Sequence, residues 1–126
     1  MKGEAINLPN APTLPFSAAI RAGDYIFVSG QIGFTDAKGG EVKGIEAQTK
    51  QCLENVKQVL TAANASLDDV VKVTVFLRNG EDFAKMNEIY RTYFVDNKPA
   101  RSTVIVGLAL PSMLVEAECI AYSPQA

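Results

Sequence analysis

The segment from Leu114 to Tyr122 constrains the fold more than any other, because its side chains alternate between two kinds of surface. One parity carries small apolar residues: Val115, Ala117, Cys119 and Ala121. The other parity carries Glu116, Glu118 and Ile120. Successive side chains of a strand point to opposite faces, so the pattern predicts one sheet face packed under helices and a second, semi-polar face. Solvent could cover that second face, but its apolar residues favour an interface with further copies of the chain.

The rest of the chain supplies the other strands and two amphipathic helices. Helical periodicity extends over residues 45–63 and 81–95, where apolar side chains recur every three or four positions. β-Prone runs predict strands at 16–21, 25–29, 70–77, 101–106 and 114–122. In the third of these, the odd positions from Val71 to Leu77 should face the core. The order ββαβαββ predicts an α+β protein, with a mixed sheet and two helices packed on one face, in a single domain over residues 1–126.

Composition limits the classes of function. The 126 residues carry a net charge of −2 without a long basic run, which disfavours binding of nucleic acid along its phosphates. No apolar stretch reaches the roughly 20 residues of a membrane span, and residues 1–6 lack an apolar signal core. Three prolines in residues 7–15 predict an extended arm. We therefore expect a cytoplasmic protein that does not bind membranes, with Cys52 and Cys119 as buried, reduced thiols.

The chain contains no histidine, which excludes Ser-His-Asp and Cys-His nucleophiles and leaves acid–base chemistry to other groups. Arg101 follows Pro99 at the start of an apolar run, and could grip a ligand carboxylate or pair with Glu116. Glu118 could hold a water or be a surface glutamate. Glu116 lies on the same face, and repulsion between the two carboxylates could raise the pKa of one of them. Lys72 could form a Schiff base, although a lysine on the polar face of a strand is more often an ion-pair partner.

Six segments in a fixed order resemble those of one known family. They are Val28-Ser29-Gly30-Gln31, Leu53-Glu54-Asn55-Val56, Val71-Lys72-Val73-Thr74-Val75-Phe76-Leu77, Phe83-Ala84-Lys85-Met86-Asn87, Pro99-Ala100-Arg101-Ser102, and the strand with Glu116 and Glu118. Each alone is a weak signal, but together and in this order they are specific. Over nearly its whole length the chain resembles the RidA/YjgF family of reactive-intermediate (enamine/imine) deaminases, also called the L-PSP endoribonuclease family.

The resemblance implies a chorismate-mutase-like α+β fold, a homotrimer with a central barrel, and ligand sites in clefts between subunits. It implies that Arg101 clamps the substrate carboxylate and that Glu118 holds the hydrolytic water. Further residues would line or support the pocket: Phe16, Ser29, Gly30, Asn87 and Thr103. The implied reaction is hydrolysis of a 2-imino acid, formed from an enamine such as 2-aminoacrylate, to a 2-keto acid and ammonia. It needs no metal or organic cofactor.

Two positions depart from the family pattern. Phe16 stands where the family's deaminases commonly have tyrosine, and Thr103 where they commonly have cysteine. Together with the loop from Gly107 to Pro111, Phe16 could shape a roomier pocket for a larger dienamine such as 2-aminomuconate. A non-enzymatic sensor of small carboxylates that keeps the arginine clamp is a second alternative. A ribonuclease activity follows only from the older family name, and the acidic net charge and the lack of histidine weigh against it.

Overall fold

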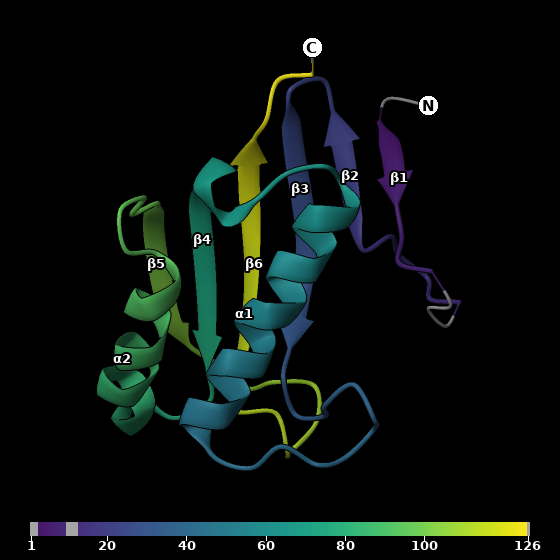
Figure 1. Ribbon diagram of the computed structural model, residues 1–126. Coiled ribbons are helices and arrows are strands. Elements are labelled where there is room, and N and C mark those ends of the chain that lie inside the picture. The colour runs from purple at the N-terminus through teal and green to yellow at the C-terminus, as the bar shows by residue number, and fades with distance from the viewer. Residues whose placement is uncertain (1–2, 10–12, 126) are drawn as a thin grey trace.

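In the computed structural model, which describes residues 3–9 and 13–125, the chain forms one mixed sheet with both described α-helices on the same face (Figure 1). The strands are β1 (Glu4–Ile6), β2 (Ala19–Ala22), β3 (Tyr25–Ile32), β4 (Val70–Leu77), β5 (Ala100–Ile105) and β6 (Val115–Tyr122). The helices are α1 (Ile45–Ala62) and α2 (Phe83–Tyr93), with short 3₁₀ turns at Leu67–Asp69 and Gly80–Asp82. Part of the predicted arm, residues 10–12, lies outside the described residues.

The strand order in the sheet is β1-β2-β3-β6-β4-β5. β4 and β5 pair in parallel, and the other neighbouring strands of this described sheet pair antiparallel. Parallel neighbours need a crossover connection, and α2 supplies it between β4 and β5 (Figure 1). β5 therefore lies at one edge of the sheet beside α2, while β6 lies in the middle under α1.

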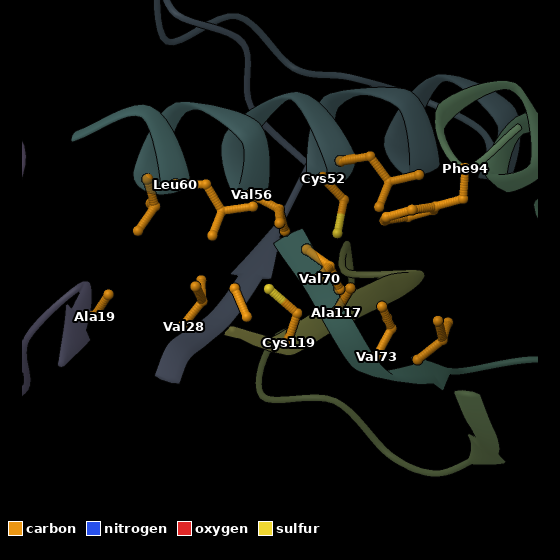
Figure 2. Close-up of a cluster of buried hydrophobic side chains, with 14 of the residues drawn as sticks. Ala19, Val28, Cys52, Val56, Leu60, Val70, Val73, Phe94, Ala117 and Cys119 are labelled. Atoms are coloured by element: carbon orange, nitrogen blue, oxygen red, sulfur yellow. The ribbon is translucent and has the colours of Figure 1, made fainter. Parts of the chain in front are cut away.

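The core lies between the sheet and α1, as Figure 2 shows. Cys52, Val56 and Leu60 point from the helix toward the sheet, and the small side chains of Ala117 and Cys119 lie on the strand beneath. Small residues on the central strand let the helix approach closely, and each buried aliphatic side chain contributes about 1.5–3 kcal/mol. The apolar face predicted from the last strand is confirmed. Both cysteines are free, and burial raises the pKa of each thiol to about 12.

The opposite face of the sheet is semi-polar, as predicted. We call it the open face; it carries Tyr25, Phe27, Glu118, Ile120 and Tyr122. Tyr25 and Phe27 are each 46% exposed, and the Tyr25 and Tyr122 rings lie 5.2 Å apart between centroids. Exposed aromatic rings gathered on a sheet favour a protein partner there over open water.

The structure differs from the sequence prediction in several details of the strands, and β3 extends to Ile32 beyond the predicted 25–29. β1 is not predicted by any pattern, because three residues are too few to show alternation, and β1 exists through its pairing with β2. The predicted strand at 16–21 begins only at Ala19. Val71 is exposed although its parity predicts a core position, because the pairing of β4 with β6 shifts between Val70 and Lys72. Val70 is buried in its place.

A buried cation ties the end of α1 to β2. Arg21 is only 6% exposed, and its guanidinium donates to the Ser123 carbonyl at 2.7 Å and to the Ala63 carbonyl at 3.1 Å. Ala63 directly follows α1, where the last carbonyl groups lack helical partners and form the negative end of the helix dipole. The arginine therefore caps the helix and joins it to the end of the chain that follows β6.

Candidate functional site

A β-bulge brings the Ser-Gly pair of β3 opposite Glu118. The pairing of β3 with β6 shifts register between Val28 and Gln31, so two residues, Ser29 and Gly30, stand opposite this one glutamate. A bulge leaves backbone groups outside the ladder and is common beside functional sites. Glu118 is exposed on the open face, so its carboxylate is available there to a ligand or a second subunit.

Ser29 joins the segment before β2 to this bulge. Its N–H donates to the Ala18 carbonyl at 2.9 Å, and its hydroxyl donates to the Ser17 carbonyl at 2.6 Å. These two bonds fix the backbone next to Phe16, whose ring is exposed. Ser29 therefore supports the predicted site through the backbone of its neighbours.

Gly30 makes room for the other glutamate of β6. A side chain at position 30 would overlap the Glu116 carboxylate, so glycine is required while that carboxylate keeps its position. Glu116 is half-buried, and this burial, followed by the negative charge of Glu118, raises the pKa of its carboxyl group. The two glutamates share a face, as predicted, but differ in setting, because Glu116 packs on the bulge and Glu118 is exposed.

A cleft of about 730 Å³ opens beside the bulge, between the residues before β2, the end of β3, and α1. Its lining includes Leu14, Phe16, Gln31, Ile32, Asn55 and Val59. Gly30 also lines it, so two predicted site residues, Phe16 and Gly30, meet here. The Asn55 side chain donates to the Ile32 carbonyl at 2.7 Å and holds α1 against the end of β3. Asn55 lies in one of the family-like motifs, but nothing in the sequence singles it out.

A second cluster of predicted site residues forms around Arg101 on the edge strand β5. Arg101 stands opposite the buried Val73, so it points toward the side of the sheet that carries the helices. Its Cζ atom lies 4.6 Å from the centre of the Tyr90 ring and 5.8 Å from the centre of the Phe83 ring, both on α2. The alternative pairing of Arg101 with Glu116 does not occur, because Glu116 lies on the opposite face.

Asn87 and Thr103 belong to the same cluster. Thr103 is two residues beyond Arg101 and so lies on the same side of β5, and Asn87 lies one turn of α2 from both Phe83 and Tyr90. The hydroxyl oxygens of Tyr90 and Thr103 are buried and have no hydrogen-bond partner among the described residues. Buried hydroxyls normally find a partner, so the cluster keeps unused hydrogen-bonding capacity beside a cation.

The aromatic stripe of α2 is only partly core. The sequence predicts that it packs inward as a whole: Phe83, Met86, Ile89, Tyr90, Tyr93 and Phe94. Met86 and Phe94 are buried, but Phe83 is 44% exposed and faces Arg101 together with Tyr90. The signal for this role is a pair of aromatic residues seven positions apart, followed by an arginine on the next strand.

Within one chain Arg101 and Glu118 face opposite sides of the sheet. Thr74 on β4 stands opposite both Glu118 and Ser102, so these three residues share the open face. Arg101 precedes Ser102 on β5 and therefore points the other way. A single chain does not bring Arg101 and Glu118 together. A ligand that contacts both residues would have to lie between two copies of the chain.

Lys72 belongs to neither cluster. Its Nζ donates to the Ser102 hydroxyl at 2.9 Å, so it lacks the apolar pocket that activates a Schiff-base lysine. Over residues 3–9 and 13–125, no group of three or more His, Cys, Asp or Glu side chains could hold a metal ion. No helix in the same ranges has the length and apolar character needed to cross a membrane.

Comparison with known proteins defines the class to which this fold and these clusters belong. The model of the Endoribonuclease L-PSP family matches residues 7–123. A RutC family protein of Pyrococcus horikoshii is 50% identical over 122 residues, which cover 94% of this chain and 97% of that protein. Reactive Intermediate Deaminase A, chloroplastic, of Arabidopsis thaliana is 39% identical over 124 residues, which cover 96% of this chain and 66% of that protein.

Solved structures share the fold over nearly the whole chain. A putative endoribonuclease of Thermotoga maritima is 41% identical with a TM-score of 0.87, covering 97% of this chain and 98% of that one. TdcF of E. coli, solved with bound serine, is 33% identical with a TM-score of 0.86. The match covers 94% of this chain and 98% of TdcF. The chain therefore belongs to the L-PSP endoribonuclease family, which is the RidA/YjgF family indicated by its motifs. The expected chorismate-mutase-like α+β fold is confirmed.

Proposed function

We propose that this chain hydrolyses reactive 2-imino acids to 2-keto acids and ammonia. Its family includes a Reactive Intermediate Deaminase A, which supports a general role of this kind. The specific proposal is carried by the setting of Arg101, whose guanidinium is held at the sheet edge by two aromatic rings. A stacked guanidinium keeps its N–H edge for a carboxylate, which is the group that all 2-imino acids share.

The complete site in this proposal lies between two copies of the chain in a homotrimer. Arg101 and Glu118 are on opposite faces of one chain, and the open face exposes large aromatic rings. Further copies on that face would bury these rings, and closed threefold symmetry would join the three sheets into a barrel. One copy then contributes the Arg101 cluster, and its neighbour contributes Glu118 and the bulge at Gly30.

The proposed chemistry needs an oriented imine carbon and one water. Arg101 holds the substrate carboxylate, and a water beside Glu118 adds to the carbon of the C=N bond while the glutamate accepts a proton. The proton then passes to the nitrogen of the carbinolamine. Glu118 then transfers the hydroxyl proton of the carbinolamine to the nitrogen, the C–N bond breaks, ammonia leaves, and the oxygen forms the carbonyl of the 2-keto acid. The sequence of steps consumes one water and changes no oxidation state.

A small substrate fits this proposal better than a large dienamine. TdcF binds serine in its solved structure, and 2-aminoacrylate is serine less one water. The larger substrate depends on Phe16 and on the loop from Gly107 to Pro111. Phe16 lines the cleft, but among the described residues the loop of the same chain does not. Arg78 holds the loop by donating to the carbonyl groups of Leu108 at 3.3 Å and Leu110 at 2.6 Å.

The test generates 2-aminoacrylate in situ and measures the release of pyruvate and ammonia. Wild type and the control Lys57→Ala, which removes an exposed positive charge on α1, should accelerate release equally. Glu118→Gln should lower kcat by about 10²- to 10⁴-fold, because it removes the proton acceptor. Arg101→Ala should raise KM and lower kcat/KM, because the substrate loses its anchor.

No acceleration by the wild type would contradict the deaminase proposal. If the inactive wild type still bound pyruvate in an Arg101-dependent way, the alternative of a small-carboxylate sensor would replace it. Equal activity of wild type and Arg101→Ala would remove the arginine from its proposed role and leave the carboxylate clamp without support.

A further inference from the structure

We propose that Tyr90 is a positioning residue for the ligand carboxylate, because its ring fixes the Arg101 guanidinium in a ready orientation. The inference rests on the proposed function for its ligand, a small 2-keto or 2-imino acid. It assigns a role to a side chain that the sequence predicts only as part of the core. It also explains why an arginine on an exposed edge strand can act as a rigid clamp.

The first step is the position of the guanidinium between two rings. Residues seven apart, such as Phe83 and Tyr90, are separated by about 10.5 Å along a helix. The Cζ atom of Arg101 lies 4.6 Å from one ring centre and 5.8 Å from the other, which places it between them. The two rings therefore bracket the cation along the surface of α2, and Tyr90 is the nearer of the two.

The second step is the support behind Tyr90. Its ring lies 4.8 Å from the Phe94 ring, between centroids, at a tilt of 36°. Phe94 is buried in the core, so it holds the Tyr90 ring from behind. Phe83 is 44% exposed, so its ring is less firmly enclosed than that of a residue packed on the core. The rigid core therefore extends through Phe94 and Tyr90 to Arg101, and Tyr90 should contribute more to the orientation of the guanidinium than Phe83.

The third step is the cost of binding. An unrestrained arginine loses side-chain freedom when it grips a carboxylate, and this loss weakens binding. A guanidinium already held by a ring loses less, and the cation–π contact keeps it in place before the ligand arrives. Removing the ring should therefore weaken carboxylate binding about 5- to 30-fold, the range expected when a partly desolvated cation–π contact is lost.

The hydroxyl group of Tyr90 has a different status from the ring. Its oxygen is buried and has no hydrogen-bond partner among the described residues. Burial raises the pKa of Tyr90, although the charge of Arg101 and the nearness of its guanidinium to the phenol oxygen oppose the shift, so the phenol is neutral at neutral pH. The proposed role belongs to the ring, which Tyr90→Phe keeps, so this variant should retain the orientation of the guanidinium.

The experiment measures pyruvate binding by titration calorimetry with the full chain. The variants are Tyr90→Leu and Tyr90→Phe, with Tyr93→Leu as a matched control on the same helix. The hydroxyl of Tyr93 donates to Glu54 on α1 at 2.7 Å. Tyr90→Leu is also made on the Arg101→Ala background. A second readout needs no ligand: side-chain NMR of labelled arginine follows rotation about the Nε–Cζ bond of Arg101.

Tyr90→Leu should weaken pyruvate binding about 5- to 30-fold, while Tyr90→Phe and Tyr93→Leu stay within about 3-fold of wild type. On the Arg101→Ala background, Tyr90→Leu should have no further effect. Rotation of the Arg101 guanidinium should become faster in Tyr90→Leu and remain as in wild type in Tyr93→Leu.

Several results would overturn the inference. Equal weakening by Tyr90→Leu and Tyr93→Leu would show a general effect on α2, and an undiminished effect on the Arg101→Ala background would show that Tyr90 acts without the arginine. If Tyr90→Leu binds pyruvate as tightly as wild type while Arg101→Ala loses affinity, the role of Tyr90 is wrong but the proposed function is not affected. Wild-type binding by Arg101→Ala would remove the clamp of the proposed function and the role of Tyr90 with it.

Discussion

Replacing Arg21 by methionine tests how the fold holds the end of α1. Methionine keeps the apolar stem of the side chain but removes the guanidinium that donates to the Ser123 and Ala63 carbonyl groups at 2.7 and 3.1 Å. A third contact, to the Gly23 carbonyl at 3.4 Å, is too long to add much. The substitution therefore leaves two acceptors without their donor, one of them at the negative end of the helix dipole.

The magnitude follows from these contacts. Each carbonyl left unpaired costs about 1–3 kcal/mol, and the Ser123 end of the chain is only half-buried, so water can satisfy part of the loss. Methionine carries no charge, so the variant also avoids the cost of burying the guanidinium, and this returns some stability. The net loss should be about 2–3 kcal/mol in the free energy of unfolding, which lowers the urea midpoint by about 1–2 M.

Urea unfolding at a fixed protein concentration measures this loss, because assembly couples to stability. The control is Arg91→Met on the exposed side of α2, where we expect a change within about 0.5 kcal/mol. A loss below about 1 kcal/mol in Arg21→Met, or one equal to that of Arg91→Met, would refute the argument that this guanidinium caps α1.

Two further predictions concern the bulge of β3 and the glutamates beside it. Gly30→Ala should lower the affinity for pyruvate, measured by calorimetry, with little change in the urea midpoint, because the added Cβ displaces the flexible Glu116 carboxylate. Adding Glu116→Ala should restore the affinity. If the losses of affinity in the two single variants simply add in the double variant, this explanation is wrong. Because burial raises the pKa of Glu116 above its ordinary value of 4.5, the folded state binds more protons there than the unfolded state, so stability falls as pH rises through the interval above 4.5. Glu116→Gln should remove that fall and stabilise the protein at pH 7 by less than about 1 kcal/mol. If the free energy of unfolding of Glu116→Gln depends on pH as that of the wild type does, the prediction is wrong.

The parity of β6 could be predicted from the sequence because its physical cause is local. Val115, Ala117 and Cys119 are small and apolar, so only one orientation of the strand buries them under α1. The shift that exposes Val71 and buries Val70 depends on the neighbouring strand, and no local pattern in the Val-rich segment records it. The same limit applies to β1, which exists only through its pairing with β2.

The candidate site shows the same division between local and distant causes. The motifs identify Arg101, Glu118 and Gly30, and the bulge opposite Glu118 supports the grouping of Gly30 with Glu118. The difference between Glu116 and Glu118 arises from contact with Gly30, which is distant in sequence. The aromatic setting of Arg101 depends on the parallel pairing of β5 with β4, which places α2 above the sheet edge. These tertiary contacts decide which face each charge occupies.

Because one chain separates Arg101 from Glu118, the proposed site has a sharp consequence for mixed assemblies. At a substrate concentration below KM, Arg101→Ala and Glu118→Gln should each lower turnover strongly when present alone. In trimers formed at random from equal amounts of both variants, a site regains both side chains when each neighbour contributes its intact residue, which happens for about one site in four. Co-expressed variants should therefore recover about a quarter of wild-type activity per site, measured by pyruvate release. Purification through two affinity tags shows whether the trimers contain both variants. If mixed trimers stay inactive, both residues must come from one copy, and the proposed site between copies is wrong. One copy could supply both residues only after a rearrangement, because they lie on opposite faces of its sheet.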